Sequence, residues 1–123
     1  MSALEAIRQA FGTSSQFVGD ITPGEVFEIL SNQRRRYIIL ELASLNGGFI
    51  RISDLARAIA EREHGRNCTI RQREQVCEAI KHTHSDQLYD AQIASVMVDT
   101  VYVGENASAF ADIIDHVAQE LDP

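Results

Sequence analysis

The sequence predicts one mainly α-helical domain with a small β-hairpin, an α+β fold, and a helical extension at each end. Three observations lead to this prediction: apolar residues recur at helical spacing, capping residues precede those segments, and two short segments alternate between apolar and polar residues. The 123 residues are 45% hydrophobic and 24% charged, which is typical of folded proteins and excludes wholesale disorder. The longest aliphatic or aromatic run, residues 37–40, is too short to cross a bilayer, and we expect a cytoplasmic protein.

Two helices are predicted before residue 31. Ser2 and Glu5 form a capping box for a first helix that Gly12 ends. After a polar connector, Thr22 is an N-cap and the following proline suits a first turn, which predicts a helix over residues 23–30.

A third helix is predicted over residues 33–45, with Asn32 as its cap and two glycines after it. Its expected buried side consists of the stem of Arg35 with Ile38, Leu42 and Leu45.

A short strand and two further helices follow. Residues 49–52 alternate like a strand, and Ser53 is the expected cap of a helix that ends near His64. Thr69 and Gln72 form a capping box that opens a long helix to about residue 87. Its inward residues are expected to be Ile70, Val76, Cys77, Ile80 and His84.

The C-terminal part predicts a β-hairpin and a last helix. Residues 94–98 and 101–103 read as strands joined by a turn at residues 99–100. Asn106 is the expected cap of a helix with a narrow apolar stripe. The stripe consists of Phe110, Ile113, Ile114, Val117 and Leu121.

From residue 23 onward, the order helix, helix, short strand, helix, helix, strand, strand, helix matches a winged helix-turn-helix. We therefore divide the chain into an N-terminal helix and connector (1–21), a winged helix-turn-helix domain (22–104) and a C-terminal amphipathic helix (105–123) that serves as a dimerisation element.

Residues 30–42 begin Leu-Ser-Asn-Gln-Arg-Arg-Arg, and residues 52–56 read Ile-Ser-Asp-Leu-Ala. Both segments resemble helix starts in metal-sensor-type, arsenical-resistance-like prokaryotic repressors. The chain resembles more closely a haloarchaeal winged-helix family of unassigned function that carries a Leu-Ser-Asn-x-Arg-Arg-Arg motif and a His-Thr-His motif, here at residues 82–84. The resemblance implies a DNA-binding regulator.

Two features depart from the general winged-helix pattern. Residues 90–93 contain no glycine where the chain turns from the long helix into the first hairpin strand. The hairpin tip at residues 99–100 is acidic, which disfavours a contact with the minor groove of DNA.

Charge is distributed unevenly along the chain. The net charge is −7, but residues 1–30 carry −3, residues 31–84 carry +4 and residues 85–123 carry −8. Nearly all basic residues are Arg, and this bias, with the acidic excess, is similar to that of proteins from salt-loving archaea. The basic segment is where a DNA-binding face is expected.

The first turn of the long helix is the expected recognition element in the major groove. Arg and Gln side chains can bind purine edges with two hydrogen bonds. The candidates for base contacts are Arg71, Gln72, Arg73 and Gln75, although Arg73 could instead lie against the core. The candidates for phosphate contacts are Arg34, Arg36, Arg51, Arg57 and Arg66. Because three consecutive arginines spread around a helix, at least one of those at residues 34–36 should be structural.

Catalysis and metal binding are not expected. The sequence has no phosphate-binding loop, nucleophile elbow, zinc-protease motif or dinucleotide fingerprint. Cys68 and Cys77 should be free thiols, and the spacing of cysteines and histidines does not fit a zinc site. We expect no cofactor, and no small-molecule effector is evident.

The leading hypothesis is a homodimeric regulator that binds double-stranded DNA. The alternative is a winged-helix module that mediates protein–protein contacts without binding DNA, which the acidic C-terminal third favours. We expect a small core to leave the terminal helices incompletely covered, and a two-fold dimer suits palindromic sites. The candidate interface residues are Leu4, Ile7, Phe11, Phe110, Ile113, Ile114, Val117 and Leu121.

Overall fold

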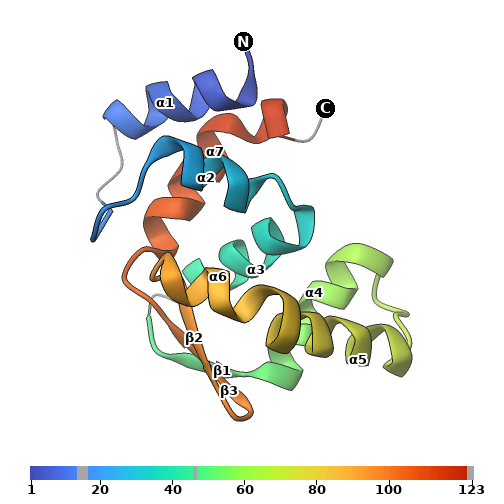
Figure 1. Cartoon of the computed structure of the whole chain (residues 1–123). Helices are drawn as coiled ribbons and strands as arrows, with labels where there is room; N and C mark the ends of the chain where they lie inside the picture. Colours follow the sequence, from blue (N-terminus) through green and yellow to red (C-terminus); the bar gives the residue numbers. More distant parts are fainter. Residues whose placement is uncertain (14–16, 46, 122–123) are drawn as a thin grey trace.

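A computed structural model describes residues 1–13, 17–45 and 47–121 as a mainly helical structure with a small antiparallel sheet, which confirms the α+β prediction (Figure 1). The elements are α1 (Ala3–Thr13), α2 (Pro23–Leu30), α3 (Gln33–Ala43), β1 (Phe49–Arg51), α4 (Ile52–His64), α5 (Ile70–Ala79), the π-helical segment η1 (Ile80–His84), α6 (Ser85–Asp90), β2 (Ala94–Met97), β3 (Thr100–Val103) and α7 (Ala107–Leu121). None of the described helices is long and apolar enough to cross a membrane.

Side-chain caps start four helices at the predicted residues. The Ser2 hydroxyl accepts a hydrogen bond from the backbone N–H of Glu5 before α1. The Thr22 hydroxyl accepts a hydrogen bond from the backbone N–H of Glu25 at the start of α2. The Asn32 side chain does the same at α3, and Thr69 with Gln72 makes the complete capping box of α5. The predicted Ser53 cap is wrong, because α4 already begins at Ile52.

The predicted buried side of α3 needs correction. The helix ends at Ala43, and Leu45 beyond it is exposed. Arg36 is buried, whereas Arg35 is only partly covered. The buried side consists of Arg36, Ile38, Ile39 and Leu42.

The sheet has the strand order β1-β3-β2, with all pairs antiparallel. Val101 at its centre pairs with Ile50 and Val96, and these three side chains face the core. The opposite face carries exposed residues, including Phe49 and Tyr102. The hairpin turns one residue earlier than predicted, because Met97 pairs with Thr100 across the turn.

The missing glycine before the hairpin is replaced by Gln92, which adopts a positive φ of 58°. The backbone N–H of Ile93 then donates to the carbonyl of Leu88 and ends the helix. Gly104 lies so close to the backbone of Gln92 that a Cβ atom would overlap it. Asn106 stands at the start of α7, but its side chain bonds to the backbone of Val18 and Ala91 instead of capping the helix as predicted.

The long predicted helix exists, but it contains a π-helical segment and extends to Asp90. Val76, Ile80 and His84 are buried, as predicted, and Cys77 is half-buried. Ile70 is 66% exposed, contrary to the prediction. Six residues separate it from Val76, which places it about 120° away around the helix.

The terminal helices belong to the single core. α7 packs against α1 and α3, and its buried side chains form one cluster with residues of every helix from α1 to α6 (Figure 1). The ring of Phe17 stacks on Phe11 and meets Phe110 edge-on, each with centroids 5.0 Å apart. The domain thus depends on both terminal helices for its packing.

Candidate nucleic-acid interface

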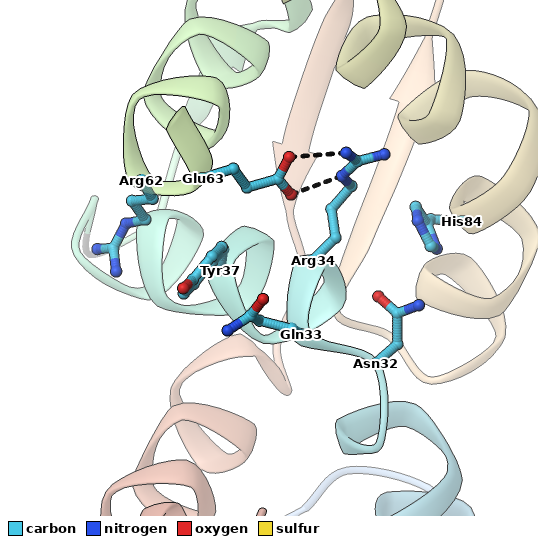
Figure 2. Close-up of a pocket in the computed structure, with 7 residues that line it drawn as sticks. All are labelled: Asn32, Gln33, Arg34, Tyr37, Arg62, Glu63 and His84. Atoms are coloured by element: carbon cyan, nitrogen blue, oxygen red, sulfur yellow. Dashed lines mark hydrogen bonds and ion pairs between the residues drawn. The ribbon is translucent and has the colours of Figure 1, made fainter. Parts of the chain in front are cut away.

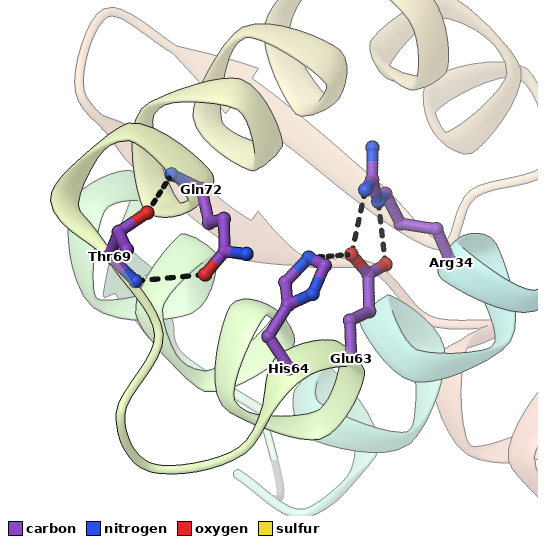
Figure 3. Close-up of polar contacts among 5 residues, drawn as sticks. All are labelled: Arg34, Glu63, His64, Thr69 and Gln72. Atoms are coloured by element: carbon purple, nitrogen blue, oxygen red, sulfur yellow. Dashed lines mark hydrogen bonds and ion pairs between the residues drawn. The ribbon is translucent and has the colours of Figure 1, made fainter.

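The first turn of α5 leaves two of the four predicted base-contact residues free. Arg71 and Gln75 are exposed. The side-chain oxygen of Gln72 accepts a hydrogen bond of 2.8 Å from the backbone N–H of Thr69, so this side chain is occupied by the cap (Figure 3). Arg73 is half-buried in a crevice beside Ala56 of α4, and its Nε has no partner in the described structure. Arg73 therefore lies against the domain, the second of the two positions expected for it.

Two of the predicted phosphate contacts are used inside the domain. Arg36 is only 7% exposed, and its Nη1 donates to the backbone carbonyl of Leu30, so the prediction that it contacts phosphate is wrong. Arg34 donates from Nε and Nη2 to the two carboxylate oxygens of Glu63, each at 2.7 Å (Figure 3). This paired carboxylate raises the pKa of the Arg34 guanidinium and compensates its charge.

The last residues of α2 accept hydrogen bonds from two of the three consecutive arginines. Arg35 donates to the carbonyls of Ile29 and Glu28, and Arg36 donates to that of Leu30. These carbonyls lie in the last turn of α2, where helical partners are missing and positive charge is favourable. Burial lowers the pKa of Arg35. The motif thus joins the end of α2 to the first turn of α3.

The other predicted phosphate contacts remain available. Arg51 and Arg66 are exposed and, like Arg71, make no side-chain hydrogen bond or ion pair within the described residues. Arg57 is exposed as well and reaches Glu61 at 3.7 Å, a long contact between neighbouring helical turns. All four guanidinium groups therefore come from the continuous segment β1–α4–α5.

The start of α4 adds a further feature to this surface. Its N-cap is Arg51, and no side chain of the described structure caps its first turn. Its first N–H, that of Ile52, donates to the carbonyl of Asp99 in the hairpin turn. Uncapped N–H groups and the helix dipole attract anions.

Carboxylates lie on the same elements. Asp54 of α4 is exposed, and so are Glu74 and Glu78 of α5. They reduce the positive potential around Arg71, so charge alone would hold DNA weakly at this surface.

Most of the predicted dimer-interface side chains are buried within one chain. Phe110, Ile113 and Ile7 are inaccessible to solvent. Ile114 and Val117 are also buried, whereas Leu4, Phe11 and Leu121 are half-buried at the margin. We expected the terminal helices at an interface because a small core would leave their apolar side chains exposed. The five buried side chains, Ile7, Phe110, Ile113, Ile114 and Val117, do not meet this condition.

A separate polar pocket of about 570 Å³ lies where α3, α4 and η1 meet (Figure 2). His84 of η1 is 3% exposed, and its Nδ1 has no hydrogen-bond partner within the described residues. Burial lowers the pKa of His84 to about 4, and the nearby charges of Arg35 and Arg34 act in the same direction, partly opposed by Glu63. The sequence placed His84 inside the domain but held no signal for the π-helical segment or for the pocket.

Cys68 and Cys77 are free thiols, as predicted. Among the residues that the structure describes, no three His, Cys, Asp or Glu side chains come together in a way that could hold a metal ion.

Comparison with known proteins gives one match. No curated protein and no solved structure matches the chain. Residues 27–103, from the last part of α2 to the end of β3, match a family described as a domain of unknown function. This span covers more than half of the chain and leaves out α1 and α7. The chain therefore belongs to the family described as Domain of unknown function (DUF7344).

Proposed function

We propose that the protein is a cytoplasmic DNA-binding transcription regulator of the winged helix-turn-helix type. In this proposal α4 and α5 form the helix-turn-helix, α5 enters the major groove, and β2 with β3 forms the wing. The observation that carries it is the order α3, β1, α4, α5, β2, β3 together with a sheet in which β1 pairs with β3.

The reading residues in this proposal are Arg71 and Gln75. Both are exposed near the N-terminal end of α5, the part of a recognition helix that meets base edges. Arg can bind guanine, and Gln can bind adenine, with two hydrogen bonds each. Gln72 and Arg73 would instead fix the position of the helix through the capping box and the contact with α4.

Phosphate contacts would come from Arg51, Arg57 and Arg66 and from the uncapped first turn of α4. Arg34 and Arg36 are not part of this set because both are engaged within the domain. The wing is given no phosphate contact, since its turn carries Asp99 and exposes the apolar Val98.

A mobility-shift titration tests the proposal, with DNA recovered by the protein from a random library as the ligand. The double substitution Arg71→Ala plus Gln75→Ala removes two base contacts of about 1–3 kcal/mol each, so affinity should fall at least about 30-fold. The matched control is Arg8→Ala plus Gln119→Ala, which removes the same groups from exposed positions on α1 and α7, with sedimentation of the control variant to verify that its mass equals that of the unsubstituted protein. Equal losses in the two variants would contradict the assignment of α5 as the reading helix.

The proposal includes a homodimer on a two-fold DNA site. Of the predicted interface residues, Leu4, Phe11 and Leu121 keep partly exposed side chains, and the contact would use this margin of α1 and α7. Sedimentation equilibrium at near-physiological salt should give twice the mass of one chain, and a strictly monomeric mass would remove the dimer from the proposal.

The second candidate is a protein-interaction module of the same shape without DNA binding. The outer sheet face favours it, because Phe49 and Met97 are 66% and 60% exposed and the ring of Tyr102 lies 6.0 Å from that of Phe49. Absence of any shift from low to molar salt would favour this module over the regulator.

A further inference from the structure

The strongest feature outside the proposed DNA-binding surface is the polar pocket that contains His84. Figure 2 shows the Arg34–Glu63 pair between Tyr37 and Arg62 on one side and His84 on the other, with the amide side chains of the α3 start below. The residues come from the first turns of α3, the last turn of α4 and the end of η1. Besides His84, the lining consists of Asn32, Gln33, Arg34, Tyr37, Arg62 and Glu63.

The π-helical segment brings His84 into the wall of this pocket. A π-helical turn holds one residue more than an α-helical turn and changes the direction in which later side chains project, and such turns are frequent at functional sites. Here the segment Ile80–His84 ends on a histidine that is 97% buried. A buried ring nitrogen without a hydrogen-bond partner costs folding free energy, so the domain keeps this ring beside the pocket at the expense of stability.

The free hydrogen-bonding groups of the pocket are mainly donors. Arg34 uses Nε and Nη2 for Glu63 and leaves Nη1, while Arg62 uses Nε for Glu41 and leaves both terminal nitrogens. The Asn32 oxygen accepts from the backbone N–H of Arg35, which leaves its amide nitrogen. Each guanidinium charge is compensated by a carboxylate, Glu63 for Arg34 and Glu41 for Arg62. The pocket is therefore characterised by an excess of free hydrogen-bond donors and not by a positive net charge.

We infer that this pocket binds a small oxyanion, a carboxylate or a phosphate group, between the free Nη1 of Arg34, the Asn32 amide and the His84 ring, which face one another in Figure 2. Guanidinium N–H groups match the oxygen geometry of both anions. The volume of about 570 Å³ suits a small metabolite. His84 is neutral at pH 7, and because its Nδ1 is inaccessible, Nε2 is the ring nitrogen that can form a hydrogen bond with the ligand. This site is independent of the proposed DNA binding.

Titration of the full chain with inorganic phosphate and, separately, with succinate tests the inference at constant ionic strength. Two-dimensional spectra of the histidine rings give the readout. Saturable shifts of the His84 resonances are expected with one anion or both, whereas His116, exposed on α7, should not move. The anion that saturates identifies the source of the oxyanion.

Two substitutions of arginine provide the comparison. Arg34→Lys keeps a cation beside Glu63 but removes the free Nη1, and it should weaken binding about tenfold, because charged hydrogen bonds contribute on that scale. Arg8→Gln removes an exposed guanidinium on α1, outside the pocket, and should leave affinity unchanged. The inference is overturned if neither anion gives saturable His84 shifts up to about 10 mM, or if both variants lose affinity equally.

Discussion

Replacement of Arg36 by Met tests whether Arg35 and Arg36 hold the end of α2 against α3. The Arg36 side chain is 7% exposed, and its Nη1 donates to the Leu30 carbonyl at 2.6 Å. A hydrogen bond from a charged group contributes about 1.5–3 kcal/mol, and a cation at a helix C-terminus adds about 0.3–1 kcal/mol. Met fills the volume of the stem and removes the burial cost of the charge, so we expect a net loss of about 2 kcal/mol.

Urea denaturation followed by circular dichroism measures this loss. For a domain of this size it corresponds to a decrease in Tm of roughly 8 °C. Arg66→Met is the matched control, because Arg66 is exposed and its side chain has no partner in the described part of the chain, and its effect should stay within about 0.5 kcal/mol. If Arg36→Met loses no more than this control, the assignment of Arg36 as the cap of α2 is refuted.

Three further predictions concern other parts of the molecule. Because the pKa of His84 is about 4 in the fold and near 6.5 in the unfolded chain, lowering the pH from 6.5 to 4 should reduce the free energy of unfolding by up to about 3 kcal/mol. His84→Gln should abolish this part of the pH dependence in denaturant titrations, and an unchanged pH profile in this variant would contradict the assignment to His84. Val98→Gly should raise the free energy of unfolding by about 1 kcal/mol, since a β-branched residue at a φ of 56° is strained, and a destabilised variant would disprove that strain. In DNA binding, Arg66→Ala should make the negative slope of log K against log salt less steep by about 0.9, whereas Arg8→Ala should leave the slope unchanged. Equal slopes for both variants would exclude Arg66 as a phosphate contact.

The sequence predicted most of the elements of the fold, because their signals are local. The Thr22, Asn32 and Thr69 caps and the apolar spacing of α4 and α7 depend on residues at most a few positions apart. Predictions failed where distant residues decide the outcome. The Asn106 side chain bonds to Val18, 88 residues away, instead of capping α7.

The same distinction applies to the candidate interface. Exposure of Arg71 and Gln75 follows from the helical phase of α5 and could be anticipated. The loss of Arg34 as a phosphate contact depends on Glu63, 29 residues later in the chain, and no local pattern indicates that pair. The burial of the α7 stripe depends on the packing of α1 and α3 around it, which periodicity alone does not reveal.

Selection of random double-stranded DNA on the purified protein tests the central claim most directly. The account predicts an enriched motif, with two-fold symmetry if the protein is a dimer, and relaxed preference at defined positions when Arg71 and Gln75 are replaced by Ala. Recovery of no enriched sequence at any salt concentration from low to molar would contradict the claim that this domain is a DNA-binding regulator.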